Sequence, residues 1–213
     1  MKKKVIWITG ASSGIGKALA IKFADEGWIV AASARREHLL KELHNENTNI
    51  HSYPLDVTNI NQCKSVLKKI LEDFVDIQIC VFGTGINDPE SEREFNLENI
   101  RKIMEVNFFG ILNSVNTIYK FYSEKKSGQI SIISSVAGYR GLPAAGAYCA
   151  SKSALTSFTE SLYFDMIKKN VVVKLISPGF IKTQMTKKNN SPMPMIKSPK
   201  FAANKIFIGL TRE

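Results

Sequence analysis

An apolar run followed by a glycine-rich turn opens the chain, with the sequence VIWITGASSGIG at residues 5–16. The run at residues 5–9 predicts a buried strand, and apolar residues at helical spacing after Gly14 predict a helix that closes at Gly27. Glycines at such a turn let the backbone approach a pyrophosphate, and the helix N-terminus supplies N–H groups and a positive dipole end. The stretch therefore predicts a dinucleotide site, although a plain glycine and serine loop would be an alternative for this motif alone.

Short apolar segments alternate with amphipathic segments along the rest of the chain, which is typical of βαβ units and a parallel sheet. We expect further strands at 28–34, 50–55, 77–82, 129–134 and 171–176, and helices at 14–26, 37–45, 60–74, 97–123, 147–169 and 198–210. The expected fold is one doubly wound α/β domain over residues 1–213, with strand order 3-2-1-4-5-6. Three prolines predict a mobile, irregular substrate loop at about 183–199.

Composition excludes several classes of protein. The 213 residues are 44% hydrophobic, enough for a full core, and no stretch approaches the roughly 20 apolar residues of a membrane span. Three widely spaced cysteines fit neither a disulfide framework nor a zinc site, so we expect a cytoplasmic protein that needs no metal. The net charge of +10 comes from scattered lysines, which favours a solvated basic surface over a nucleic-acid site. The three histidines all precede residue 52, which gives a Ser-His-acid hydrolase little support.

A tyrosine and a lysine four residues apart, Tyr148 and Lys152, share one face of an expected helix. A nearby ammonium lowers the pKa of a phenol, and a tyrosine so tuned can move a proton while a nicotinamide carries a hydride. Ser135 lies upstream, at the end of an expected strand. Tyr122 and Lys126 repeat the spacing in a polar run without an upstream serine, and for them we expect solvated surface.

These motifs resemble the short-chain dehydrogenase/reductase family from Val5 to about Thr186. The resemblance implies a Rossmann fold and NAD(P)-dependent interconversion of a carbonyl and a secondary alcohol. It implies that Ser135 holds the substrate oxygen, that Tyr148 is the acid/base and that Lys152 tunes it and binds the ribose. Asn107 would keep a water beside Lys152, while a capping or core hydrogen bond is an equal alternative for that residue alone.

The same resemblance implies a set of cofactor-binding residues from the glycine turn to the segment after the sixth strand. Within the set, Asp56 would contact the adenine and the last three residues would position the carboxamide. The set comprises Gly10, Ser12, Ser13, Gly14, Ile15, Gly16, Asp56, Val57, Gly83, Gly85, Tyr148, Lys152, Pro178, Gly179 and Thr183.

Cofactor choice depends on the end of the second strand, which has the sequence SARR at residues 33–36. An NAD site places an acid about 20 residues past the glycines, and an NADP site needs room and an arginine for the 2′-phosphate. Ala34 stands at the acid's position, and Arg35, with Arg36 beside it, can grip a phosphate as a bidentate cation. We therefore expect NADP(H), with two surface arginines at a helix start as the alternative.

Two features depart from the family pattern. The sequence FGTG at residues 82–85 replaces the usual Asn-Asn-Ala-Gly, so the asparagine hydrogen bonds that brace the sheet are lost. Gly85 still permits close approach of the backbone to the cofactor, and Thr84 is the candidate to replace one lost bond. The family normally continues to a seventh strand, whereas this sequence ends at Glu213, which leaves the sheet edge and one family dimer contact open.

Apolar residues suggest the substrate and an assembly. Those expected to line the pocket favour a hydrophobic ketone, aldehyde or alcohol: Tyr139, Leu142, Pro143, Met185 and Met193. Those expected at the interface of a homodimer or homotetramer are Phe158, Leu162 and Phe164. A non-catalytic dinucleotide sensor or scaffold of the same fold remains an alternative, as does a nucleic-acid binder that salt-dependent retention on DNA would reveal.

Overall fold

Strands and helices alternate in the computed structural model, which describes residues 3–89, 95–188 and 192–212. The strands are β1 (Val5–Thr9), β2 (Ile29–Ala34), β3 (Ile50–Pro54), β4 (Ile79–Phe82), β5 (Gln129–Ile133) and β6 (Val172–Ile176). The helices are α1 (Gly14–Asp25), α2 (Glu37–Glu46), α3 (Ile60–Phe74), α4 (Leu97–Met104), α5 (Gly110–Lys125), α6 (Gly146–Ile167) and α7 (Pro199–Thr211). The predicted elements are therefore confirmed, with ends that move by a few residues.

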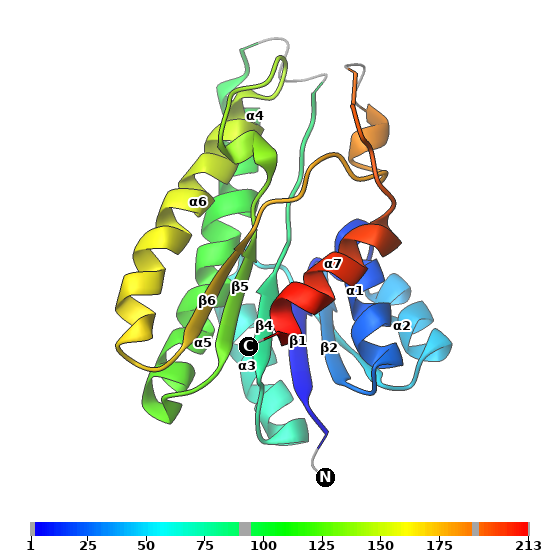
Figure 1. The fold of residues 1–213 in the computed structure, drawn as a ribbon, viewed down its shortest axis with the longest axis vertical. Helices are drawn as coiled ribbons and strands as arrows, with labels where there is room; N and C mark the ends of the chain where they lie inside the picture. The colour runs from blue at the N-terminus through cyan, green and yellow to red at the C-terminus, as the bar shows by residue number, and fades with distance from the viewer. Residues whose placement is uncertain (1–2, 90–94, 189–191, 213) are drawn as a thin grey trace.

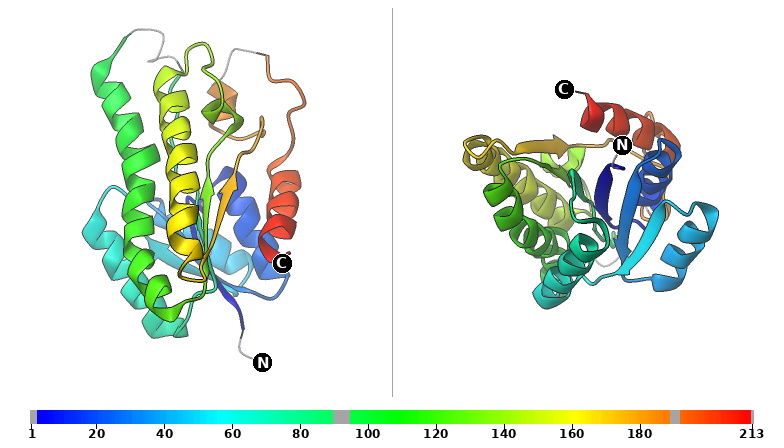
Figure 2. Two further views of the ribbon diagram at one scale, coloured as in Figure 1. Left: turned by 60° about the vertical axis from the view of Figure 1, so that its left-hand side comes forward. Right: turned by 90° about the horizontal axis from the view of Figure 1, so that it is seen from below.

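The six strands form one parallel sheet in the order β3-β2-β1-β4-β5-β6, as predicted. Successive side chains of β1 enter opposite layers, because strand side chains alternate: Trp7 packs with α3, α5 and α6, whereas Ile6 and Ile8 pack with α1, α2 and α7. Both faces of the sheet are thus covered by helices (Figures 1 and 2). Strand order reverses between β1 and β4, and a crevice at the carboxyl ends of strands at such a point is where ligands bind.

The helix expected at 97–123 is interrupted by a π-helical turn, Glu105–Phe109, between α4 and α5. The N–H of Gly110 bonds to the carbonyl of Glu105, five residues earlier, which widens the helix by one residue. A Cβ on Gly110 would lie 2.6 Å from Cγ2 of Val57, so the glycine lets the widened turn pack against the loop after β3. Such turns occur frequently at functional sites, and this one carries Asn107.

The prediction that Tyr122 lies on solvated surface is wrong. Its side chain is fully buried, and its hydroxyl lies 3.3 Å from Sγ of Cys80 on β4. Lys126 is exposed, with φ 54° at the C-terminus of α5. The chain then doubles back at Gly128, where a Cβ would lie 2.5 Å from the Tyr122 ring. The polar sequence after Tyr122 marks the end of helix α5. The Tyr122 ring is buried because it lies on the side of that helix that faces the sheet.

Only one of the three residues expected at a subunit interface is exposed. Leu162 is buried in the core beneath α6, and Phe158 packs against the same core. Phe164 is 66% exposed, together with Tyr163 and Ile167 on the outer face of α6. Helical spacing puts residues 155, 158, 162 and 166 on the stripe of α6 that covers the sheet. The prediction that Leu162 lies at a subunit interface is therefore wrong. None of the helices in the described ranges is long and apolar enough to span a membrane.

Candidate active site

A cavity of about 720 Å³ opens at the carboxyl end of the sheet, within the size range of small-molecule sites. It is bounded by the glycine turn, the ends of β2 to β5, the start of α6 and the segment after β6. Every predicted site residue except Asn107 lines it. These lining residues are Gly10, Ser12, Ser13, Gly14, Ile15, Gly16, Arg35, Arg36, Asp56, Val57, Gly83, Gly85, Ser135, Tyr148, Lys152, Pro178, Gly179 and Thr183.

The glycine turn is packed too closely for side chains. Gly10 has φ +75°, and a Cβ there would lie 3.0 Å from the carbonyl carbon of Gly83. A Cβ on Gly16 would lie 2.3 Å from the carbonyl oxygen of Gly10. The turn therefore brings the N-terminus of α1 directly to the cavity wall, where its free N–H groups and dipole can hold an anion.

Two arginines directly after β2, Arg35 and Arg36, lie beside the glycine turn. Nη2 of Arg36 donates hydrogen bonds to the hydroxyls of Ser12 and Ser13, each at 2.9 Å. Arg35 is exposed and lines the same cavity, next to the half-buried Ala34. Sequence reasoning gave the phosphate-gripping role to Arg35 and saw no contact for Arg36. The structure adds that Arg36 is hydrogen-bonded to the glycine turn.

Asp56 and Val57 follow β3 at the same edge of the cavity. Oδ1 of Asp56 accepts hydrogen bonds from the backbone N–H and the hydroxyl of Thr58, at 3.0 and 2.9 Å. Val57 is buried, and its carbonyl accepts a 3.0 Å hydrogen bond from Nδ2 of Asn113 on α5. The loop is therefore held in place by its own hydrogen bonds and by the helix behind it.

Tyr148 and Lys152 project from the first turns of α6 toward the cavity. Nζ of Lys152 lies 5.7 Å from the centre of the Tyr148 ring and donates a 3.0 Å hydrogen bond to the carbonyl of Ile133. Burial lowers the pKa of Lys152 to about 8. Burial also raises the pKa of Tyr148, and its hydrogen bond with Ser135 opposes that shift. The direction for Tyr148 is opposite to the expected one, because the ammonium points to the end of β5 and burial dominates.

Two neighbouring serines at the end of β5 have different surroundings. Ser135 caps a short 3₁₀ turn, Val136–Gly138, by accepting a 3.1 Å bond from the N–H of Ala137, and it faces the cavity. Ser134 is buried, and its hydroxyl donates to the carbonyl of Lys152 at 2.9 Å. Ser134 therefore joins β5 to the helix that carries Tyr148 and Lys152. The sequence analysis did not predict this contact. The two consecutive serines at the end of the strand were the feature that could have indicated it.

Asn107 is fully buried behind the cavity and joins three segments. Its Oδ1 accepts from the N–H of Ile86 at 2.7 Å, and its Nδ2 donates to the carbonyl of Ile86 at 2.9 Å. Nδ2 also donates to Oγ of Ser151 at 3.1 Å, and this hydroxyl donates to the carbonyl of Tyr148 at 2.7 Å. A Cβ on Gly85 would lie 3.4 Å from Oδ1 of Asn107 and 3.7 Å from Nζ of Lys152. The amide is thus next to the lysine but engaged in protein hydrogen bonds, and Ser151 is a partner that sequence reasoning missed.

The FGTG loop after β4 is braced differently from the expectation. The N–H of Gly83 donates to Oγ1 of Thr9 at 3.3 Å, which joins the loop to β1. Oγ1 of Thr84 is buried and has no hydrogen-bond partner within the described part of the chain. The expectation that Thr84 replaces a lost bracing bond is therefore wrong. A Cβ on Gly83 would lie 2.8 Å from Cδ1 of Ile133, so the side chain of β5 occupies the space that a larger residue would need.

The segment after β6, from residue 178 to residue 186, forms a further wall of the cavity. The carbonyl of Pro178 accepts a 3.0 Å bond from the N–H of Val136, and a Cβ on Gly14 would lie 3.1 Å from Cγ2 of Thr183. The loop expected to be wholly irregular includes a 3₁₀ turn, Thr186–Lys188, and a bridge between Ile181 and Lys197, whereas residues 189–191 lie outside the described ranges.

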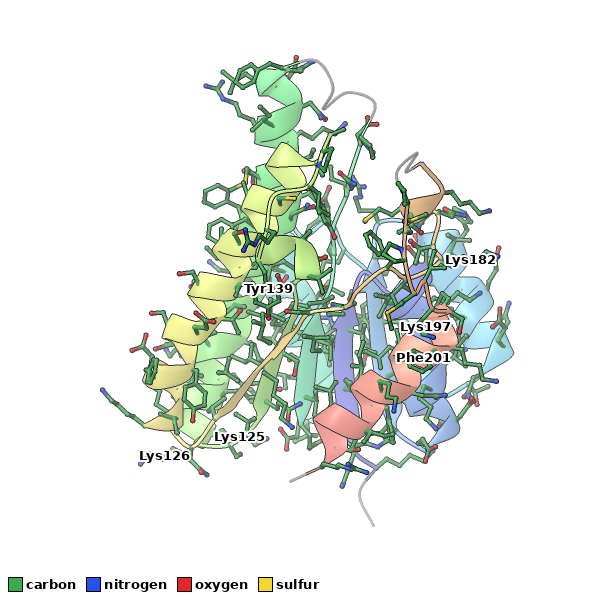
Figure 3. All side chains as sticks on the ribbon, turned by 45° about the horizontal axis from the view of Figure 1, so that its top comes forward. Lys125, Lys126, Tyr139, Lys182, Lys197 and Phe201 are labelled. Atoms are coloured by element: carbon green, nitrogen blue, oxygen red, sulfur yellow. The ribbon has the colours of Figure 1, made fainter. Side chains whose placement is uncertain are left out.

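Of the apolar residues expected around the substrate, only Met185 lines the cavity. Tyr139, labelled in Figure 3, is 62% exposed, and its hydroxyl donates to Oγ of Ser177 at 3.3 Å. Leu142, Pro143 and Met193 are likewise absent from the cavity wall. The expected apolar lining is therefore not assembled in this conformation, because the 139–143 turn stands out from the protein surface.

The doubly wound sheet, the glycine turn at its switch point and the Ser135, Tyr148 and Lys152 cluster define a dinucleotide-binding oxidoreductase. The model of the short chain dehydrogenase family matches residues 4–194. The chain belongs to that family and is an NAD(P)-dependent dehydrogenase or reductase.

Known proteins agree with this assignment over most of their length. An uncharacterized oxidoreductase of Myxococcus xanthus is 31% identical over 216 residues, which cover 100% of this chain and 85% of the relative. The 3-oxoacyl-[acyl-carrier-protein] reductase FabG of Thermotoga maritima is 32% identical and covers 88% of this chain and 78% of its own. The solved structure of ElxO with NADP bound has a TM-score of 0.88 and 26% identity, over 99% of this chain and 92% of ElxO.

Proposed function

We propose that the protein is an NADP(H)-dependent oxidoreductase that interconverts a carbonyl group and a secondary alcohol. The observation that carries the proposal is the hydrogen-bonded pair of Ser135 and Tyr148 beside the buried Lys152, in the cavity that the glycine turn also lines. A protein that only senses a dinucleotide needs the turn but has no use for this cluster. The scaffold alternative is therefore the less favoured one.

In the proposed reaction, the nicotinamide supplies or accepts the hydride when the cofactor is bound. Ser135 would donate a hydrogen bond to the substrate oxygen, and this bond strengthens as negative charge develops there during reduction. Tyr148 would give its phenolic proton to that oxygen, and it would take the proton back in the direction of oxidation. The positive charge of Lys152 would favour the phenolate and lower the energy of that transfer. Asn107 would act indirectly, by fixing the loop that approaches Lys152.

A preference for the phosphorylated cofactor is supported by the charges at the end of β2. Arg35 and Arg36 both line the cavity, and Ala34 occupies the position at which a carboxylate would repel a phosphate. Because ElxO, a structural relative, was solved with NADP bound, the same cofactor is the natural first ligand to test here.

The substrate is proposed to be a small molecule with an apolar carbonyl or alcohol. Met185 at the cavity wall supports apolar character, and the loop at about 183–199 is proposed to cover the substrate within a single domain. The relative from Thermotoga maritima is named as a 3-oxoacyl-[acyl-carrier-protein] reductase, so 3-oxoacyl thioesters belong in the first screen. Ketones, quinones and sugars complete it.

The test is NADPH oxidation over that screen, with wild type and a Tyr148→Phe variant side by side. The proposal requires turnover of at least one carbonyl substrate by wild type and its loss in the variant, while both proteins bind NADPH. A variant that turns over substrate as fast as wild type would contradict the role of Tyr148. Binding of NADPH with no turnover of any substrate class would instead favour the dinucleotide sensor.

We further propose a homodimer or homotetramer in the cytoplasm, without nucleic-acid or membrane partners. The support for assembly is the exposed aromatic and apolar group on the outer face of α6, formed by Tyr163, Phe164 and Ile167. The support for a reducing compartment is that Cys63, Cys80 and Cys149 are buried and that no disulfide joins cysteines within the described residues.

A further inference from the structure

Lys152 is held at both of its ends by two consecutive residues at the end of β5. Its ammonium nitrogen donates a 3.0 Å hydrogen bond to the carbonyl of Ile133, and its main-chain carbonyl accepts a 2.9 Å bond from the hydroxyl of Ser134. Lys152 and Ser134 are 4% and 3% exposed, so water does not compete for these bonds. The side chain and the backbone of the lysine are therefore both fixed relative to one short segment.

The peptide unit between Ile133 and Ser134 gives this segment its direction. The unit is trans, so its carbonyl and its N–H point in opposite directions. The N–H of Ser134 donates to the carbonyl of Ile176 on β6 at 2.8 Å, which turns the carbonyl of Ile133 toward β4 on the other side of β5. The ammonium of Lys152 lies on that side, because a Cβ on Gly85, in the loop after β4, would lie 3.7 Å from Nζ. Ser134 thus contributes to both contacts of the lysine.

A second hydroxyl, that of Thr156, meets the same carbonyl. Oγ1 of Thr156 lies 3.0 Å from the carbonyl oxygen of Lys152 and 3.1 Å from Oγ of Ser134. A Cβ on Gly138 would lie 3.0 Å from both the carbonyl oxygen and Oγ1, so the backbone of the turn after Ser135 packs directly on this group. Each hydroxyl has one proton to donate, so either of them can serve the Lys152 carbonyl when the other is removed.

The two hydroxyls differ in what they join. Thr156 lies on α6 and bonds to a carbonyl four residues earlier, as the buried Thr159 does to the carbonyl of Leu155 at 2.6 Å. Bonds of this kind stay within the helix. The bond of Ser134 instead crosses from the end of β5 to α6, at the residue whose ammonium faces the cavity. Its place in the fold indicates that it positions Lys152.

The surroundings of the ammonium make its position important for its charge. The carbonyl of Ile133 from β5 is a neutral partner, and Gly85 and Asn107, which come close to it from two other segments, are neutral as well. The titratable group that faces the ammonium is Tyr148, from its own helix. Burial is the cause that lowers the pKa of Lys152 to about 8. Access of water would therefore raise this pKa.

We propose that Ser134 is a positioning residue, whose hydroxyl holds the backbone of Lys152 against the end of β5 and so keeps the ammonium on the Ile133 carbonyl, away from water. The inference rests on the proposed function, in which the ammonium has to stay beside Tyr148 while that residue transfers its proton. Ser134 acts through Lys152 and takes up no proton itself.

The test is the titration of Lys152 in the free protein, followed by NMR of lysine labelled with ¹³C at Cε. A Lys152→Met variant identifies the signal by its loss. Ser134→Ala removes the bond between strand and helix and leaves the Lys152 carbonyl to Thr156. Thr156→Val is the matched control, because it removes the other hydroxyl from the same carbonyl and leaves the Ser134 bond in place. Thermal unfolding reports that each variant is folded.

In Ser134→Ala the pKa of Lys152 should rise from about 8 toward the ordinary lysine value of 10.5, by about one pH unit, because water reaches the ammonium. In Thr156→Val it should stay close to the wild-type value. An unchanged pKa in Ser134→Ala, an equal rise in Thr156→Val, or a wild-type value already near 10.5 would each overturn the proposal.

If Ser134→Ala does not fold, Ser134→Cys takes its place, because a thiol occupies the same position with a weaker donor. The pKa of Lys152 should then rise by a smaller amount, and an unchanged value would overturn the proposal in the same way.

The titration needs neither cofactor nor substrate, so its outcome is separate from the test of the proposed function. Predicted pKa values in a protein without turnover would contradict the oxidoreductase and uphold the placement of Lys152 by Ser134. Where wild type reduces a carbonyl, kcat of Ser134→Ala should fall by roughly tenfold or more, and kcat of Thr156→Val should stay close to wild type. An unchanged kcat in Ser134→Ala, despite a raised pKa of Lys152, would overturn the positioning role.

Discussion

The ammonium group of Lys152 is held 3.0 Å from the backbone carbonyl of Ile133, so the helix α6 is joined to the end of β5 through a buried cation. A buried ammonium that is paired only with a neutral carbonyl is costly, which is why the pKa of Lys152 falls to about 8. Burial therefore favours the neutral form of Lys152 over the charged one.

This relationship predicts how stability depends on pH. The unfolded chain holds the Lys152 proton up to the ordinary lysine pKa of 10.5, whereas the folded protein releases it near 8, so between these values the unfolded state binds more protons. Wild type should therefore gain stability relative to Lys152→Met as pH rises from 8 to 10.5, by up to about 3 kcal/mol. Urea denaturation of both proteins at pH 7 and pH 10 measures the difference. Parallel pH dependence of the two would contradict the shifted pKa.

Tyr148→Phe should abolish turnover and leave NADPH affinity nearly unchanged, because the hydroxyl acts on the substrate proton. The matched change Tyr122→Phe removes a buried hydroxyl that lies beside Cys80, far from the cavity. It should keep turnover and cost about 1 kcal/mol of stability. Steady-state kinetics and thermal unfolding of both variants provide the comparison. Loss of turnover in Tyr122→Phe with a stable fold would reverse the assignment of the two tyrosines.

Arg35→Ala should weaken NADPH binding about tenfold or more and leave NADH binding nearly unchanged, because a charged hydrogen bond to the 2′-phosphate is lost. Arg36→Ala should weaken both cofactors, because its guanidinium also fixes the hydroxyls of Ser12 and Ser13 in the glycine turn. Calorimetric titration with each cofactor distinguishes the two roles. Equal or tighter binding of NADH by wild type would refute the preference for NADP.

Ser151→Ala should lower both stability and turnover. The change leaves Nδ2 of the buried Asn107 with one partner fewer, at a cost of about 1 to 2 kcal/mol. Loosening of Asn107 would then free the loop at Gly85 that approaches Lys152. Ser153→Ala is the matched control, since that exposed hydroxyl bonds only the carbonyl of Gly138 among the contacts described for it. Equal effects of the two changes would show that Ser151 has no special connection to the site.

Phe164→Glu should dissociate a homo-oligomer, because it places a charge in the exposed apolar group on α6. The mass measured by light scattering at micromolar concentration should fall to half of the wild-type value or less. The thermal stability of the subunit should not change. Wild type that is already monomeric would contradict the proposed assembly.

Much of the architecture was readable from local patterns. Strand β1 and helix α3 were predicted with the bounds that the structure has, because a buried strand and an amphipathic helix each impose a period on neighbouring residues. The sheet order was expected as the usual one for the doubly wound dinucleotide-binding fold, which the βαβ alternation and the glycine turn indicate. The cluster of Ser135, Tyr148 and Lys152 in one cavity was likewise expected from spacing and from family resemblance.

Tertiary structure alone decided the burial and the partners of these side chains. Tyr122 and Leu162 lie at helical spacing from the buried residues Ile118 and Leu155, and the packing of α5 and α6 on the sheet decides that this face of each helix is core. The tie of Arg36 to the glycine turn and that of Lys152 to Ile133 join residues far apart in the chain. Periodicity encodes which face of an element is apolar. Hydrogen-bond partners, and the pKa shifts that burial causes, depend instead on which elements the fold brings together.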